Sequence, residues 1–101
     1  MYAEGQLYFD LEDYQSANQS FNNLLKDFPD SENAEEVRYK IVLSSFNLAE
    51  NSIYEKRKER YEETLENVEQ FNKRYKKSTY LKDVRQLERQ ARTAIKSLKN
   101  D

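Results

Sequence analysis

Residues 5–29, GQLYFDLEDYQSANQSFNNLLKDFP, decide how this chain folds. Small and aromatic residues recur in this stretch at fixed offsets, namely Gly5, Tyr8, Ala17, Phe21, Leu24 and Pro29. Glu12-Asp13-Tyr14 lies between the two halves and is a turn signal, so the offsets predict two helices joined by a turn. Because such a hairpin cannot bury its apolar face alone, the stretch predicts a domain in which further helices stack on it.

The rest of the chain has the same helical periodicity, and we expect an all-α fold of about five helices. A single Gly and a single Pro in 101 residues favour helix almost throughout. The expected helices cover about 2–11, 13 or 14 to 28, 34 to about 50, a fourth carrying a stripe from Tyr61 to Tyr75, and 78 to about 99. The expected buried stripe of the second helix is Ala17, Phe21, Leu24, Leu25 and Phe28.

Local signals mark where some of these helices begin. Asn33 is followed by Glu36 and Ser52 by Glu55, which is the spacing of a capping box. Ser78 is the expected cap of the last helix. Residues 55–60 are all charged, and they form either a solvated loop or an extra helical turn.

The offsets of the opening stretch match the tetratricopeptide repeat, a helix-turn-helix unit of about 34 residues. The second half of the chain repeats the first at a longer distance, since Tyr14 corresponds to Tyr61 and Phe21 to Val68. We therefore expect one domain, 1–101, organised as a short helical-hairpin solenoid. Its expected parts are a first repeat at 1–31, a second repeat at 32–78 with an insertion near 49–60, and a terminal helix at 79–101.

The composition excludes several classes of chemistry. The chain has no Cys and no His, which removes thiolate nucleophiles, imidazole acid-base catalysis and Cys/His metal sites. No cofactor or metal is expected, and an enzyme is the least expected class. The net charge of −2 hides an asymmetry, because residues 1–50 carry 3 Lys/Arg and 10 Asp/Glu whereas residues 51–101 carry 14 and 9.

One break between helices resembles a particular branch of these repeats. Phe28-Pro29-Asp30-Ser31, followed by Ala34 and Tyr39, resembles the BamD family, the lipoproteins of the bacterial outer-membrane β-barrel assembly machine. The strings at 48–53 and 59–64 resemble an insertion of Bacteroidetes-type members. The likeness covers essentially the whole chain, placed as the family's C-terminal repeats. The family's lipid-carrying Cys is absent, and Tyr75-Lys76-Lys77-Ser78 replaces a second Phe-Pro-x-Ser break.

The resemblance implies a non-catalytic scaffold for protein–protein contact in outer-membrane β-barrel assembly. The full protein would lie on the periplasmic face of the outer membrane and contact the barrel-forming subunit and unfolded barrel proteins. This chain itself is expected to be soluble, with membrane association only through a lipid anchor outside it. Two alternatives stay open: a generic tetratricopeptide adaptor in another complex, and a basic-helix binder of membrane surfaces.

The last expected helix carries a basic stripe. Its members recur in steps of three and four residues and therefore share an arc of about 100°; they are Lys82, Arg85, Arg89, Arg92, Lys96 and Lys99. The stripe is either a solvated face, a docking surface for an acidic protein, which the resemblance favours, or a contact for anionic lipid or nucleic acid. Nucleic acid is not an expected partner, because no nucleic-acid motif is present and the first half is acidic.

A second candidate surface is the concave groove that the first helix of each tetratricopeptide pair lines. Carried over by offset, its candidate binding residues are Tyr2, Gln6, Phe9, Glu36, Lys40 and Leu43. Aromatic and amide groups of this kind suit an extended peptide with apolar side chains. The alternative is that Tyr2 and Phe9 pack against a preceding repeat.

Overall fold

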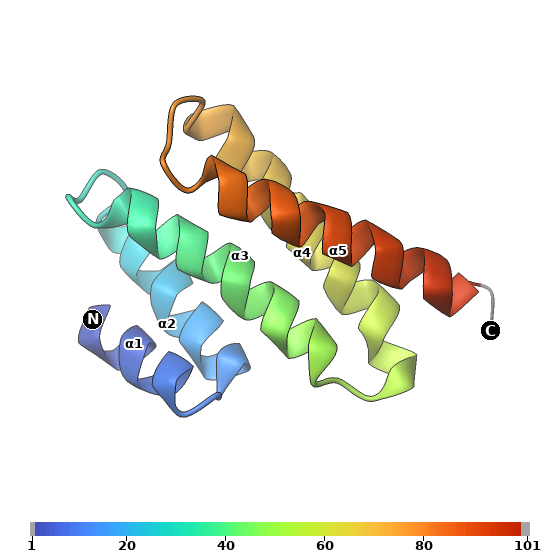
Figure 1. Ribbon diagram of the computed structural model, residues 1–101. Coiled ribbons are helices and arrows are strands. Elements are labelled where there is room, and N and C mark those ends of the chain that lie inside the picture. Colours follow the sequence, from blue (N-terminus) through green and yellow to red (C-terminus); the bar gives the residue numbers. More distant parts are fainter. Residues whose placement is uncertain (1, 100–101) are drawn as a thin grey trace.

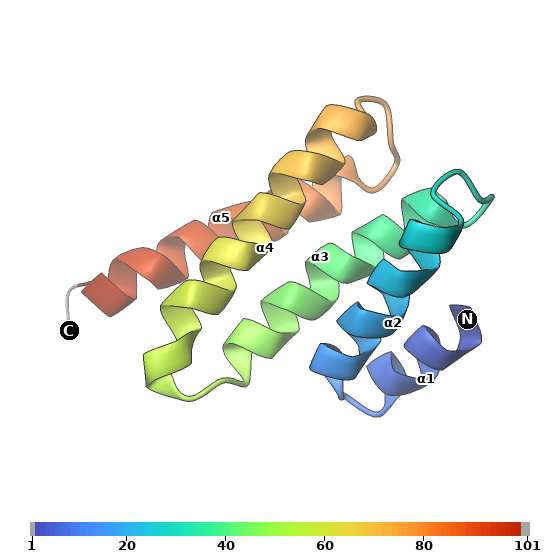
Figure 2. The same cartoon turned by 180° about the vertical axis from the view of Figure 1, so that it is seen from behind.

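The computed structural model describes residues 2–99, which form five helices and no strand, as expected for an all-α fold. The helices are α1 (Tyr2–Asp10), α2 (Tyr14–Asp27), α3 (Ala34–Glu50), α4 (Tyr54–Arg74) and α5 (Leu81–Lys99). Figures 1 and 2 show two layers, with α1, α3 and α5 in one and α2 and α4 in the other. The molecule measures 43 × 29 × 19 Å, and its smallest dimension is about two helix diameters.

Successive helices pack as antiparallel hairpins, in the manner of tetratricopeptide repeats. α1 packs on α2, α3 on both α2 and α4, and α5 on α4 and α3 (Figure 1). The core has three clusters of buried residues: Ala17, Phe21, Leu24, Val37 and Ile41; Val42, Val68, Phe71, Val84 and Leu87; and Ala49, Tyr61 and Ala91. Each cluster includes residues of α3, so α3 is the helix around which the two layers are built.

The second helix ends before Pro29, as the sequence predicts, but Phe28 does not join its buried stripe. Phe28 is the C-cap residue of α2, with φ −136° and ψ 67°. Because it has left helical geometry, its side chain points away from the stripe and is 53% exposed. The expectation that Phe28 is buried is wrong, whereas Ala17, Phe21 and Leu24 are buried.

The polar residues near the starts of α2, α3 and α4 differ in the hydrogen bonds that their side chains make. Asp13 precedes α2, and its carboxylate accepts a hydrogen bond of 3.2 Å from the backbone N–H of Ser16. Asn33 precedes α3 but makes no side-chain cap bond, so the capping box with Glu36 does not form. The prediction of a capping box at Ser52 is wrong, because α4 begins after Ile53. The Ser52 hydroxyl donates to the Leu48 carbonyl instead.

Replacing Asp13 by Ala is expected to cost about 1 kcal/mol of unfolding free energy, since it removes the one bond to an orphan N–H at the start of α2. Asn33→Ala is the matched control, because the side chain it removes makes no cap bond, and its cost is expected to be below about 0.5 kcal/mol. Urea denaturation followed by far-ultraviolet circular dichroism measures both. Equal losses in the two variants would contradict this account of the caps.

Residues 55–60 are helical, so the solvated-loop alternative is wrong. They form the first turns of α4, and only three residues, 51–53, separate α3 from α4. Two arginines hold this end of α4 against the turn: Arg57 Nε donates to the Ser52 carbonyl (2.8 Å) and Arg60 Nη1 to the Ser52 hydroxyl (2.6 Å). The Tyr54 hydroxyl donates to the Leu98 carbonyl (3.2 Å), which ties the start of α4 to α5.

A polar latch joins the α2–α3 turn to the α4–α5 turn at one end of the molecule. Arg38 Nη1 donates to the Tyr75 hydroxyl (2.6 Å) and to the Pro29 carbonyl (3.3 Å). The Arg38 guanidinium also lies 5.8 Å from the centroid of the Tyr75 ring, within cation–π range. The Ser78 hydroxyl donates to the Glu35 carboxylate (2.7 Å) and accepts from the backbone N–H of Tyr80 (3.0 Å). These bonds fix one hairpin relative to the next.

Candidate protein-binding surfaces

The first candidate surface lies along α5. One side of this helix is apolar and buried against α3 and α4 through Val84, Leu87 and Ala91. The opposite side carries the predicted basic residues, and all those whose side chains are described are exposed: Lys82, Arg85, Arg89, Arg92 and Lys96. The side chain of Lys99 lies outside the described part of the chain. The predicted amphipathic character of the helix therefore leaves its basic side free.

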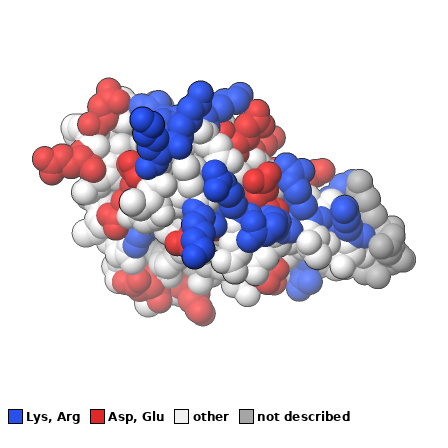
Figure 3. All heavy atoms as spheres, turned by 45° about the horizontal axis from the view of Figure 1, so that its top comes forward, with Lys and Arg blue, Asp and Glu red and all other residues white. Residues whose placement is uncertain are grey.

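The same surface continues beyond α5 across the α4–α5 turn. Four more exposed cations lie at the end of α4 and in this turn: Lys73, Arg74, Lys76 and Lys77. Figure 3 shows the blue atoms gathered over this turn and in a line along α5. We call these nine residues of 73–96 the basic band. Sequence reasoning found only the α5 part as a site, although four cations within five positions were available as a signal.

Few of the cations in the basic band are neutralised by the chain itself. Arg92 pairs with Glu88 (2.9 Å), Arg74 with Asp30 (3.2 Å) and Lys73 with Glu69 (3.1 Å). Exposed pairs of this kind are worth about 0.2–1 kcal/mol and exchange readily. Within residues 2–99, the other members have no carboxylate within 4 Å; they are Lys76, Lys77, Lys82, Arg85, Arg89 and Lys96. Among Arg85, Arg89, Arg92 and Lys96 of the predicted stripe, only Arg92 is paired.

The second candidate surface is the groove side of α1 and α3, and the structure brings most of its predicted residues together. Lys40 lies at the centre, where its ammonium donates to the Gln6 side chain. The same ammonium lies 5.3 Å from the Phe9 ring centroid and 6.0 Å from that of Tyr2. Gln6 in turn donates to the Asp10 carboxylate (2.8 Å). These side chains therefore contact one another across the α1–α3 boundary.

Glu36 adds a negative charge to this groove, next to two tyrosines. Burial raises the pKa of the Tyr2 hydroxyl, and the charge of Glu36 raises it further. Burial likewise raises the pKa of Tyr80, with Glu36 and Glu35 contributing. The Tyr80 ring stacks on Tyr39 at 4.5 Å between centroids. The groove therefore combines aromatic rings with carboxylates.

Two of the predicted groove positions also belong to the interior. Tyr2 and Phe9 pack against the first core cluster, and Tyr2 lies 6.0 Å from the Phe21 ring. Leu43 packs against the second cluster, between α3 and α5, because α5 covers that part of α3. Leu43 therefore takes part in the packing of the second cluster, although it lies only three residues from Lys40 on α3.

Sequence reasoning missed a third surface, a polar hollow on the opposite layer of the molecule. α2 and α4 both pack on α3 rather than on each other, so α3 is visible between them in Figure 2. The space between them is a hollow of about 440 Å³. It is lined mostly by amides and charged groups: Gln15, Asn18, Asn22, Ser45, Leu48, Lys56, Glu59, Arg60, Glu63, Glu66 and Asn67. Residues 14–25, which supply three of the amides, contain no charged residue in a chain that is 36% charged.

Two possible roles find no support in the described residues. None of the helices in residues 2–99 combines the length and the apolar character needed to cross a membrane. In the same part of the chain, no three Asp, Glu, His or Cys side chains are grouped so as to hold a metal ion.

A search of curated proteins found no match. The sequence matches the family YfiO, described as outer membrane lipoprotein, over residues 1–96. The match extends across both helical hairpins and most of α5, so it includes all three surfaces described above. The chain therefore belongs to the YfiO family of outer membrane lipoproteins.

Proposed function

We propose that this chain is a non-catalytic scaffold in the assembly of outer-membrane β-barrel proteins, acting on the periplasmic face of that membrane. Membership in a family of outer membrane lipoproteins supports the location. The break at Phe28-Pro29-Asp30-Ser31 and its resemblance to BamD support the assembly role. The proposed partners are the barrel-forming subunit and unfolded barrel proteins.

The basic band is the observation that carries this proposal. Its α5 portion is fixed by a buried apolar side, so the exposed cations form a rigid row rather than a mobile tail. Arg85 and Arg89 lie one turn apart, and neither has a carboxylate partner in residues 2–99. A planar guanidinium pairs with carboxylates through two parallel hydrogen bonds, so this row suits an acidic protein surface.

The test is recovery of the barrel-forming subunit from detergent-solubilised outer membranes, identified by mass spectrometry. The double variant Arg85→Glu/Arg89→Glu is compared with Lys26→Glu/Lys58→Glu, which makes the same change in charge at exposed positions outside the band. We expect the wild type and the Lys26/Lys58 variant to recover the subunit and the Arg85/Arg89 variant to lose at least about tenfold. Circular dichroism checks that all three are folded.

Two other outcomes would contradict parts of the proposal. Equal recovery by all three proteins would leave the assembly role standing and remove the band as the docking surface. If none of them recovers the subunit, the assembly role fails and a generic adaptor remains.

The extent of the band also favours a second candidate function, contact with anionic lipid headgroups. Its cations run from the α4–α5 turn along α5, and each cation near such a surface is worth about 1 kcal/mol. Binding to phosphatidylglycerol vesicles that is lost in salt above the physiological range would support this function, since screening shortens the reach of surface charges. Vesicles of phosphatidylcholine alone are the control.

A further inference from the structure

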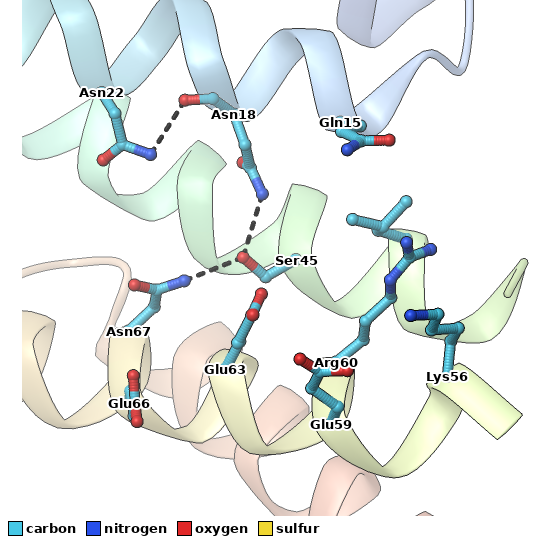
Figure 4. A pocket seen from close by; sticks show the side chains of 11 residues that line it. Gln15, Asn18, Asn22, Ser45, Lys56, Glu59, Arg60, Glu63, Glu66 and Asn67 are labelled. Atoms are coloured by element: carbon cyan, nitrogen blue, oxygen red, sulfur yellow. Dashed lines mark hydrogen bonds between the residues drawn. The ribbon is translucent and has the colours of Figure 1, made fainter.

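The polar hollow between α2 and α4 has two chemically different walls. The α2 wall presents the amides of Gln15, Asn18 and Asn22, which lie at helical spacing on one side of that helix. The α4 wall presents Glu59, Glu63 and Glu66 at the same kind of spacing. In Figure 4, Asn18 of α2 and Glu63 of α4 point toward Ser45 of α3, while the other residues of the two walls lie closer to their own helices. The hollow is therefore lined along its length by hydrogen-bonding groups, with Leu48 as its one apolar residue.

The floor of the hollow is a hydroxyl held by two amides. Ser45 of α3 is 3% exposed, and its oxygen accepts from Asn18 Nδ2 (3.1 Å) and Asn67 Nδ2 (2.8 Å), as Figure 4 shows. Both bonds leave the hydroxyl proton of Ser45 available for an acceptor. The side-chain oxygen of Asn18 is buried and has no hydrogen-bond partner. A buried acceptor without a partner is unfavourable, and a small rotation of the Asn18 amide that let an N–H group of a ligand reach it would remove that cost.

A free hydroxyl proton next to an unpaired amide oxygen matches the N–H and C=O of one residue in an extended segment, which point to the same side of the chain. That C=O would accept from Ser45, and that N–H would donate to Asn18. Side-chain amides bind main chain in this way without reading a particular sequence, because every non-proline residue offers the same pair of groups. The hollow is an open channel between two helices, so an extended segment fits it better than a compact ligand.

The α4 wall determines which side chains such a segment would carry. Within residues 2–99, Glu59, Glu63 and Glu66 have no basic group within ion-pair distance. The cations of the hollow, Lys56 and Arg60, lie at the same end as Glu59, and Arg60 is bonded to Ser52. Three unpaired carboxylates along one wall favour lysine or arginine in the ligand.

From this arrangement we propose that the polar hollow is a binding site for an extended, positively charged polypeptide segment. The α2 amides and Ser45 hold its main chain, and Glu59, Glu63 and Glu66 pair with its basic side chains. The site is separate from the basic band, which lies on α5 and the α4–α5 turn and would repel the same ligand. It goes beyond the proposed function, because it adds a partner of opposite charge on the other layer of the molecule.

The probe is a short fluorescein-labelled peptide of alternating lysine and serine, and its counterpart of alternating glutamate and serine is the negative control. Fluorescence anisotropy measures affinity for the wild type and for Glu59→Gln/Glu63→Gln/Glu66→Gln. The matched control is Glu55→Gln/Glu62→Gln/Glu69→Gln, which makes the same charge change at exposed positions of α4 outside the hollow. All six positions are exposed, so both variants are expected to fold.

We expect saturable binding of the lysine peptide by the wild type. The hollow variant should bind at least about tenfold more weakly, and the control variant less than about threefold. In nitrogen-15 NMR spectra, the side-chain amide signals of Asn18, Asn22 and Asn67 should shift on titration with the peptide. Absence of binding, equal loss in the two variants, or shifts confined to other residues would each overturn the proposal. None of these outcomes depends on recovery of the barrel-forming subunit.

Discussion

Replacing Phe71 by Ala is expected to destabilise the fold by about 3–5 kcal/mol, which is the loss found for removing a fully buried aromatic side chain. Phe71 is 1% exposed and belongs to the cluster in which α3, α4 and α5 meet. Its ring also lies 5.0 Å from that of Tyr75, the residue of the polar latch. A domain of this size has about 5–15 kcal/mol of stability in total, so the variant should be unfolded in part at moderate temperature.

The chain offers a matched control in Phe28→Ala. The chemical change is identical, but Phe28 is 53% exposed, so its removal should cost less than about 1 kcal/mol. Urea denaturation monitored by circular dichroism gives both values. Comparable losses would mean that the packing of α3, α4 and α5 described here is wrong.

Gly5→Val is expected to cost about 3 kcal/mol, although valine is the better helix former. Gly5 is buried in α1, and a Cβ at this position would lie 2.5 Å from Phe21 Cε1 and 2.6 Å from Phe21 Cδ1. Phe21 is 0% exposed, so its ring has no free space to move into. The substitution must therefore push α1 away from α2.

Two further variants separate this clash from a general effect on α1. Ala3→Val adds the same side chain at an exposed position of the same helix and should cost about 0.5 kcal/mol. In a background of Phe21→Leu, which shortens the side chain that meets position 5, Gly5→Val should lose at least half of its cost. Additive losses in the double variant would show that Phe21 is not what limits position 5.

The helices could be predicted from the sequence because their signals are local. The offsets from Gly5 to Pro29 and the scarcity of Gly and Pro fix where helices occur, and the ends of α2 agree within a residue. Side-chain capping could not be predicted equally well. Asn33 and Ser52 have the required spacing, but the actual partner depends on backbone angles and on competing acceptors such as the Leu48 carbonyl.

The surfaces likewise differ in how far the sequence could predict them. The α5 part of the basic band follows from one helix and its periodicity, so sequence was sufficient to place Arg85, Arg89 and Lys96 on an exposed side. The contact of Lys40 with Gln6 joins positions 34 residues apart and depends on how α1 meets α3. The polar hollow exists only because α2 and α4 both pack on α3 and leave a space between them, which is a property of packing that no single helix encodes.

The polar latch has a mechanical consequence for how the surfaces are presented. Arg38 and Tyr75 join the two turns at one end of a molecule that is 43 Å long. A change in the angle between the hairpins at this contact therefore has its largest effect at the opposite end. A rotation of a few degrees between the hairpins at this point would displace the opposite end by several ångströms. Substitutions of Arg38 would then alter the spacing between the hollow and the band without touching either. The affinity of a partner that binds both surfaces at once would depend on this spacing, whereas the affinity of a partner that binds only one surface would not.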